Sequence, residues 1–215
     1  MKPFLPKSQS LARRAAVLSA LGAALLSSAC APLILGGAMV GGVMMSTDRR
    51  TSGTQIEDQG IELKAGARLR EQLGERAHIN VNSYNRIALL TGEAPTEADR
   101  EAAERLVAQV ENVTRVLNEV SVAGKSSLTS RSNDVLIASK VKASLVDARD
   151  LISNAFYVVV ERGTVYIMGR VTEREATRAA EIARGVSGVQ KVVRAVELIS
   201  EEELARITPK PAPTK

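Results

Sequence analysis

Apolar residues recur along the chain with two different periods, and the order of those periods predicts a fold class. Between residues 61 and 69 an apolar side chain occurs at every fourth position, which places these side chains on one face of a helix. Two short runs typical of strands follow, at 79–82 and 86–91, and residues 83–85 read as the turn between them. A second helical pattern and a valine-rich strand at 113–122 complete the order α-β-β-α-β.

The same pattern occurs again about 76 residues later. Ile137, Val141 and Leu145 repeat the stripe of the first helix, and predicted strands at 156–160 and 164–171, with a turn at 162–163 between them, repeat the hairpin. A further helix and a last strand at 189–199 complete the second copy. Copies of this size can each hold a small core, so we predict an α+β chain with one domain at 56–122, a linker at 123–133 and a second domain at 134–199.

Helix starts and glycines support the repeat. Thr172 followed by Glu175 fits a capping box, whereas Thr96 followed by Asp99 fits it only loosely. Gly92 and Gly169 follow apolar runs, and we expect them to end a strand and let the chain turn steeply into a helix. Gly188 lies before the last strand of the second copy. We assign Gly92, Gly169 and Gly188 structural roles.

Residues 1–29 have the three parts of a secretory signal peptide: a basic start, an apolar core of about 12 residues and a small-residue end. Cys30 follows directly, and residues 26–30 resemble a lipobox, which implies that Cys30 is acylated. Ser27 stands where that pattern usually has Leu, and an ordinary signal peptide that leaves a free thiol is the alternative. Ala31 is not the Asp associated with inner-membrane retention, so the resemblance implies the periplasmic face of the outer membrane.

The residues after Cys30 read as a tether. Residues 33–45 are apolar but contain four glycines, and as a helix they would reach only about 20 Å, too short for a bilayer core of about 30 Å. We expect them to lie against the membrane, or else to pack on the protein or stay disordered. Residues 48–53 read as a polar linker. At the other end, residues 200–215 read as a short acidic helix and a proline-rich tail.

Composition excludes several classes of function. With 2% aromatic residues, one His and one Cys, the chain lacks the side chains for base stacking, a Cys/His metal site or a disulfide framework. Removal of residues 1–29 leaves 25 basic against 24 acidic residues, so the basic footprint of a nucleic-acid binder is lost. No nucleophile motif is present, and His78 lacks a second ligand nearby. We predict no enzyme, cofactor, metal or small-molecule substrate; a hydrolase using two converging carboxylates is the minor alternative.

Charge is divided between the copies. Residues 56–122 carry 8 basic and 12 acidic side chains, whereas residues 123–199 carry 12 basic and 8 acidic ones, so the net charges are −4 and +4. Anionic membranes attract Lys and Arg, so only the second copy is suited to them. On its first helix Leu136 lies roughly opposite the buried stripe, beside Lys140, and Val135 and Lys142 lie toward the flanks. We predict a lipid-binding surface there; the alternative is that Leu136 packs on the other copy or on residues 124–132.

Two stretches of the second copy, 165–173 and 186–192, resemble the BON domain family, with the glycine after an apolar run and the Val-x-Gly-Val-x-x-Val entry to the last strand. Residues 89–92 and 110–116 repeat them, with Asn112 in place of the second glycine. The resemblance implies two tandem domains, each a three-stranded mixed sheet packed against two helices. Two copies behind an acylated Cys also resemble dual-BON outer-membrane lipoproteins.

That resemblance implies binding to anionic phospholipid through the second domain and a role in outer-membrane integrity. The alternative is a periplasmic adaptor for partner proteins in envelope assembly, cell division or peptidoglycan remodelling, with the acidic first domain as its docking surface.

Overall fold

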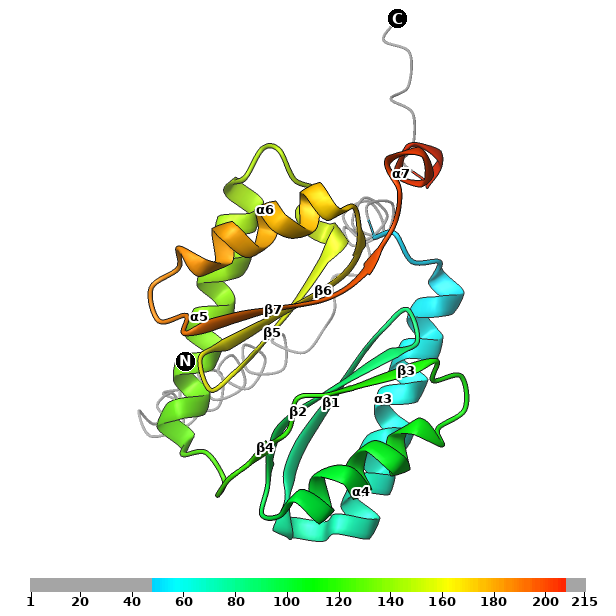
Figure 1. The fold of residues 1–215 in the computed structure, drawn as a ribbon, viewed down its shortest axis with the longest axis vertical. Helices are drawn as coiled ribbons and strands as arrows, with labels where there is room; N and C mark the ends of the chain where they lie inside the picture. The colour runs from blue at the N-terminus through cyan, green and yellow to red at the C-terminus, as the bar shows by residue number, and fades with distance from the viewer. Residues whose placement is uncertain (1–47, 208–215) are drawn as a thin grey trace, which may run out of the picture. The chain divides into compact units, whose positions relative to one another are not determined.

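The computed structural model describes residues 48–207 (Figure 1). The predicted signal peptide, Cys30, the apolar segment 33–45 and the proline-rich tail lie outside the described residues. Within them the chain forms two copies of one α+β unit, as the sequence predicts.

The first copy is built on a mixed sheet. Its elements are α3 (Ser52–Leu73), η2 (Gly74–Arg76), β1 (His78–Tyr84), β2 (Ile87–Ala94), α4 (Glu97–Ala108), β3 (Arg115–Asn118) and β4 (Ser121–Val122). Strand β2 pairs antiparallel with β1 and parallel with β3 and β4. The last strand is therefore interrupted, whereas the sequence predicts one continuous strand at 113–122. The side chain of Asn118 accepts a hydrogen bond from the amide of Val120, and this local bond interrupts the strand.

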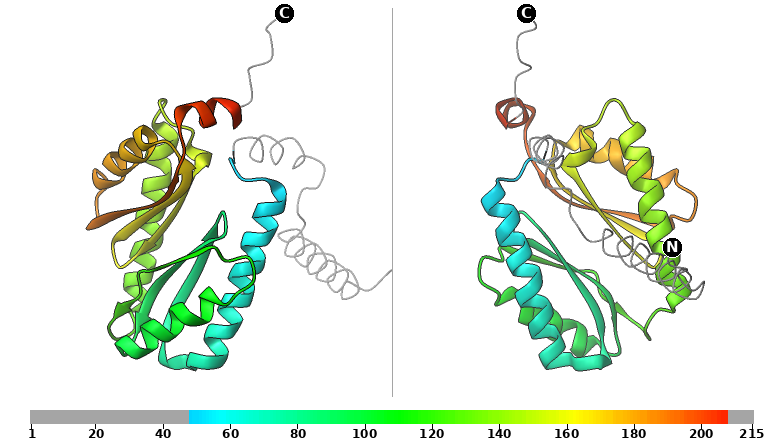
Figure 2. Two further views of the ribbon diagram at one scale, coloured as in Figure 1. Left: turned by 45° about the vertical axis from the view of Figure 1, so that its right-hand side comes forward. Right: turned by 180° about the vertical axis from the view of Figure 1, so that it is seen from behind.

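The second copy has the same order without the interruption. Its elements are α5 (Leu128–Asp147), η3 (Ser153–Ala155), β5 (Phe156–Glu161), β6 (Thr164–Val171), α6 (Glu173–Arg184) and β7 (Lys191–Leu198), and the short helix α7 (Glu201–Ile207) follows. The strands lie in the order β5-β6-β7, antiparallel and then parallel. In each copy both helices cover one face of the sheet (Figures 1 and 2).

The predicted apolar stripes form the two cores. Ile61, Ala65 and Leu69 are buried against the first sheet, and Ile137, Val141 and Leu145 are buried against the second. Burying a large aliphatic side chain stabilises a fold by about 1.5–3 kcal/mol, so the residues that repeat at a spacing of 76 are the ones that hold each unit together.

Both first helices begin earlier than the sequence predicts. Helix α3 starts at Ser52, where the side chain of Thr51 accepts from the amide of Thr54, and α5 starts at Leu128, where Ser127 caps in the same way. Much of what the sequence assigns to linkers is therefore the first turn or two of a helix. The capping box of α6 is complete, whereas at α4 only the Thr96 half forms, as predicted.

The first hairpin turn is also shifted from its predicted place. The turn residues are Asn85 and Arg86, both with positive φ, and Ser83 belongs to β1. The second hairpin turns at Arg162–Gly163, also with two positive φ values, as in a type I′ turn. The two turns are therefore equivalent, although Asn-Arg lacks the glycine that signals such a turn.

A buried aspartate holds each turn. Asp58 of α3 accepts hydrogen bonds from the amides of Asn85 (2.9 Å) and Arg86 (2.8 Å). Asp134 of α5 accepts from the amides of Arg162 (2.9 Å) and Gly163 (2.8 Å). These bonds compensate for burial of a charged group, and they explain why the first turn tolerates an arginine with positive φ.

The two strand glycines do not end their strands, which corrects the prediction. Gly92 lies opposite Ile79 within β2, and Gly169 lies within β6. A Cβ atom at Gly92 would lie 2.1 Å from the carbonyl oxygen of His78, and one at Gly169 would lie 2.4 Å from that of Ala155. Glycine is needed because the neighbouring backbone approaches closely. Gly188 lies between α6 and β7, where a Cβ would meet Ile137 at 3.0 Å.

Candidate functional site

The two copies are joined by a third hydrophobic cluster. It is formed by residues from β1 and β2 of the first copy and from β6 and β7 of the second: Tyr84, Leu89, Tyr166, Met168 and Ala195. Because strand residues alternate between faces, Leu89 lies on the sheet face opposite Ala88 and Leu90, which belong to the core under the helices. Both central strands are therefore buried on both faces.

Residues 48–50 are a structured strap rather than the predicted polar linker. The guanidinium of Arg49 donates to both carboxylate oxygens of Glu175, at 2.8 Å each, and to the carbonyl oxygen of Arg170 at 3.0 Å. The side chains of Arg49 and Glu175 are only 5% and 4% exposed. Burial raises the pKa of Glu175, but the hydrogen bonds from Arg49 and from the Thr172 amide outweigh it, so the pKa lies below its ordinary value.

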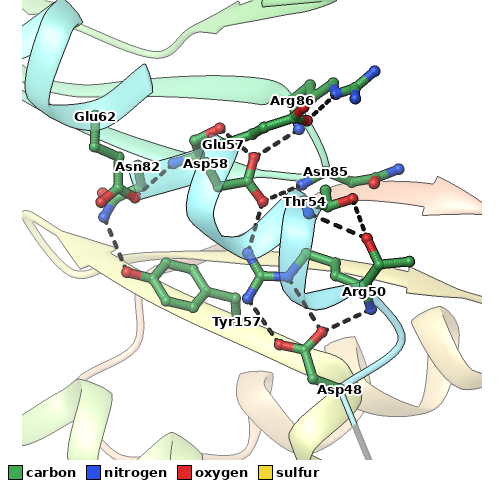
Figure 3. A network of polar contacts seen from close by, with 12 residues as sticks. Asp48, Arg50, Thr54, Glu57, Asp58, Glu62, Asn82, Asn85, Arg86 and Tyr157 are labelled. Carbon is green, nitrogen blue, oxygen red and sulfur yellow. Dashed lines mark hydrogen bonds and ion pairs between the residues drawn. The ribbon is translucent and has the colours of Figure 1, made fainter. Parts of the chain in front are cut away.

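Arg50 attaches the strap to the first copy. Its guanidinium pairs with Asp58 and with Asp48, at 2.8 Å each (Figure 3). It also lies 4.1 Å from the centroid of the Tyr84 ring. Asp58 therefore holds both the hairpin turn and the strap. Consecutive arginines thus bind one copy each, and residues 48–50 connect them at one point.

The structure brings together two acids, Glu161 and Glu93, that are far apart in the sequence and that no motif connects. Glu161 of β5 accepts a hydrogen bond from the side-chain amide of Asn80 at 3.2 Å. The carboxylate of Glu93 in β2 lies 3.4 Å from the guanidinium of Arg162 and 3.6 Å from the imidazole of His78. The Glu93 side chain has no exposed surface, and one of its oxygens has no hydrogen-bond partner in the described part of the chain. A substrate cannot reach the enclosed carboxylate of Glu93, whereas Glu161 lines a pocket of about 300 Å³ together with His78 and Asp134. Among residues 48–207 no three His, Cys, Asp or Glu side chains are placed to hold a metal ion.

Glu161→Gln is expected to stabilise the chain at neutral pH, by on the order of 1 kcal/mol. Burial, and then the charge of Glu93, raise the pKa of Glu161, so at pH 7 the native state must hold a charge that it disfavours. Glutamine keeps the acceptor for Asn80 without the charge. The gain should be full above the raised pKa and should fade as the pH falls toward the ordinary value of 4.5, because the native glutamic acid then becomes neutral.

Urea unfolding at pH 7 and pH 4 measures this difference. Glu71→Gln, on the exposed face of α3, serves as the control and should change stability by less than about 0.5 kcal/mol. A loss of stability in Glu161→Gln at pH 7 would show that the charge contributes favourably through Arg131.

The predicted lipid-binding residues lie exposed on α5. Leu136 is 59% exposed, and Val135, Lys140 and Lys142 are also exposed. Neither the other copy nor residues 124–132 cover Leu136, so the alternative that it packs there does not hold. Within residues 48–207 neither lysine forms a hydrogen bond or an ion pair, which leaves both ammonium groups available.

Two further apolar residues extend this surface beyond the four predicted ones. Leu128, 80% exposed, and Val146, also exposed, lie 7 residues before and 11 residues after Val135. Separations of 7 and 11 residues return to the same face of a helix, so Leu128, Val135 and Val146 form one row beside Leu136. We call these four residues with Lys140 and Lys142 the α5 face. The spacing alone could have revealed it.

The first copy does not repeat these residues at the matching positions. At the positions 76 residues earlier, Gln59 and Gly60 stand in place of Val135 and Leu136, and Gly66 and Arg70 in place of Lys142 and Val146. Lys64 corresponds to Lys140, but it pairs with Glu111 at 3.0 Å. Helix α3 has exposed apolar residues of its own, Ile56 and Leu63, but no lysine without an ion-pair partner within residues 48–207 lies beside them. No helix within residues 48–207 is long and apolar enough to cross a membrane.

Comparison with known proteins assigns the family. Models of the BON domain match residues 57–124 and 133–200, so the chain belongs to the BON domain family and carries two copies of the domain. It is 35% identical over 177 residues to "Outer membrane lipoprotein DolP" of Haemophilus influenzae, which covers 81% of this chain and 91% of that protein. It is therefore a dual-BON protein of the DolP type.

Two further relatives share the domain. The "21 kDa hemolysin" of Actinobacillus pleuropneumoniae is 35% identical over 154 residues, covering 71% of this chain and 79% of that protein. "Osmotically-inducible protein Y" of Escherichia coli is 30% identical over 146 residues, covering 65% and 72%.

Proposed function

We propose that this protein is a non-enzymatic lipoprotein of the outer membrane, anchored on the periplasmic face through Cys30, which binds anionic phospholipid through the α5 face and supports outer-membrane integrity. The observation that carries the proposal is the α5 face itself: four exposed apolar side chains and two lysines that have no ion-pair partner within residues 48–207, all on one helix. The similarity to the outer membrane lipoprotein of H. influenzae supports the location.

The α5 face has the chemistry of a weak interfacial binder. Each lysine near an anionic surface contributes about 1 kcal/mol, and partial burial of Leu136 and Val135 adds about 1 kcal/mol each. A total of about 4 kcal/mol corresponds to a dissociation constant near 1 mM. The face would therefore hold a membrane only weakly on its own.

An acylated Cys30 removes that weakness. Stable anchoring requires two signals, and tethering gives an attached surface an effective concentration in the millimolar range. A millimolar binder on such a tether would spend much of its time on the bilayer. The anchor keeps the protein at the membrane, and the α5 face determines which surface of the second copy meets it.

Leu136→Glu and Lys140→Glu are each expected to weaken binding to anionic vesicles by about tenfold or more, because each removes about 1 kcal/mol of attraction and adds a charge that the lipid repels. The measurement is cosedimentation of the chain from residue 30 on, carrying Cys30→Ser, with vesicles of phosphatidylglycerol at millimolar lipid. Vesicles of phosphatidylcholine should bind far less, and added salt should weaken the binding.

Leu63→Glu is the matched control, because Leu63 is a 74% exposed leucine on the first helix of the other copy. It should leave binding unchanged. Equal losses in Leu63→Glu and Leu136→Glu would place the effect in net charge rather than in the α5 face. No binding by the unsubstituted chain would overturn the proposal and leave the protein-interaction adaptor as the function to test.

A further inference from the structure

A groove lies between the first helix and the first strand of the second copy. Its floor is formed by the buried side chains of Leu145 and Val158, with the half-buried ring of Phe156. Val146 and Lys142 lie at its edge and are exposed. The groove has a volume of about 260 Å³. Since Val146 and Lys142 also belong to the α5 face, the groove opens directly onto the surface that the proposed function assigns to the membrane.

The walls of the groove combine one cation with an apolar floor. Lys142 has no ion-pair partner within residues 48–207. The hydroxyl of Tyr157, a further wall residue, already accepts a hydrogen bond from Asn82 at 3.2 Å (Figure 3). An apolar floor with one charged group beside it is complementary to an alkyl chain that ends in an anion.

The first copy provides an internal comparison. Its equivalent groove, between α3 and β1, has a volume of only about 50 Å³. Gly66 stands in place of Lys142, and Arg70 in place of Val146. A Cβ atom on Gly66 would lie 3.3 Å from the Arg70 guanidinium, so the arginine covers this part of the helix surface. The same fold therefore closes the groove in one copy and leaves it open, with a lysine, in the other.

We propose that the groove between α5 and β5 binds one alkyl chain of an anionic phospholipid, with the phosphate paired to Lys142. The proposal rests on the proposed function and deepens it: the second copy would capture an individual lipid in addition to lying on the bilayer. The occupant is a phospholipid because the groove is continuous with the α5 face, and because Lys142 is the one charged wall residue among residues 48–207.

The test uses the chain from residue 30 on with Cys30→Ser, and decyl phosphate below its critical micelle concentration as the probe. Amide shifts in an NMR titration should move saturably at Phe156 and Val158, and should not move at Ile79 of the first copy. Val146→Arg, which copies Arg70, should weaken binding by about tenfold. Asn133→Arg adds the same charge to the same helix, away from the groove and outside the α5 face, and should bind as the unsubstituted chain does. Val146 and Asn133 are both exposed, so neither change threatens folding.

Equal binding by Val146→Arg and Asn133→Arg would overturn the proposed groove site, because binding that depends on charge alone would not distinguish the two variants. Inorganic phosphate that shifts the same amides with the same affinity would also overturn it, since no chain would then be needed. If the chain binds anionic vesicles but its amide shifts do not respond to decyl phosphate, the proposed membrane function stands and the proposed groove site is rejected. Decyl phosphate bound without vesicle binding would support the groove and reject the membrane function.

Discussion

Arg49→Ala is expected to lower the free energy of unfolding by about 3–4 kcal/mol. The substitution removes three hydrogen bonds at once and leaves Glu175, 4% exposed, with the Thr172 amide and without its hydrogen-bonded cation. A buried carboxylate without its partner is among the most costly defects in a fold. Urea unfolding followed by circular dichroism measures the loss.

Two further variants test whether the loss comes from the pair. Arg105→Ala removes a pair that is 65% and 60% exposed, and should cost less than about 0.5 kcal/mol. Arg49→Met combined with Glu175→Gln removes both charges but keeps an acceptor for the Thr172 amide, and should recover much of the loss. A loss of about 0.5 kcal/mol or less in Arg49→Ala would show that residues 48–50 do not hold the copies together.

The Arg49–Glu175 pair also makes the free energy of unfolding depend on pH. The pKa of Glu175 lies below its ordinary value of 4.5, so the folded state favours the charged form. The contribution of the pair is complete above pH 4.5 and is lost as the pH falls through the lowered pKa. The difference between the unsubstituted chain and Arg49→Ala should therefore shrink in acid.

The periodic pattern predicted the parts of the fold that local spacing determines. Stripes such as Ile61, Ala65 and Leu69 require only a helix and a sheet to cover them, and the structure confirms them. The first hairpin turn was misplaced because its positive φ values depend on Asp58, which is 27 residues away from Asn85. The contribution of a carboxylate from another helix cannot be recognised from the sequence of the turn itself.

The contacts between copies were less accessible to sequence reasoning. Residues 87–90 and 165–168 are apolar at consecutive positions, a pattern typical of strands buried on both faces. That pattern could have predicted a covered outer face on each sheet, but not that the other copy covers it. Arg49 and Arg50 read as a solvated linker because their partners, Glu175 and Asp58, are identified only once the copies are packed.

The α5 face could be predicted only in part. The position of Leu136 opposite the buried stripe predicts its exposure, because the regular period of a helix places only one of its faces against the core. Leu128 and Val146 obey the same geometry, but Leu128 falls in what the sequence treated as a linker. The groove could not have been predicted, because its volume depends on how closely α5 approaches β5.

Gly92→Ala is expected to destabilise the first copy by about 3 kcal/mol or more, at the upper end of single substitutions. A methyl group there would lie 2.1 Å from the carbonyl oxygen of His78, which belongs to the paired backbone of β1. The φ of Gly92, +108°, adds backbone strain for any L side chain. Neither conflict can be relieved by a rotamer change, so strand β1 must move away from β2.

Gly60→Ala is the same substitution with the opposite expectation. Gly60 lies within α3, and a Cβ atom there would meet nothing within 4 Å. Alanine should therefore stabilise the helix by roughly 0.5–1 kcal/mol, through the smaller conformational freedom of the unfolded chain. Thermal unfolding of both variants separates the effect of the backbone contact at Gly92 from the general effect of replacing glycine with alanine. Similar changes in the stability of Gly92→Ala and Gly60→Ala would show that β1 moves away from β2 at little cost, and that the close approach of the two strands does not require glycine.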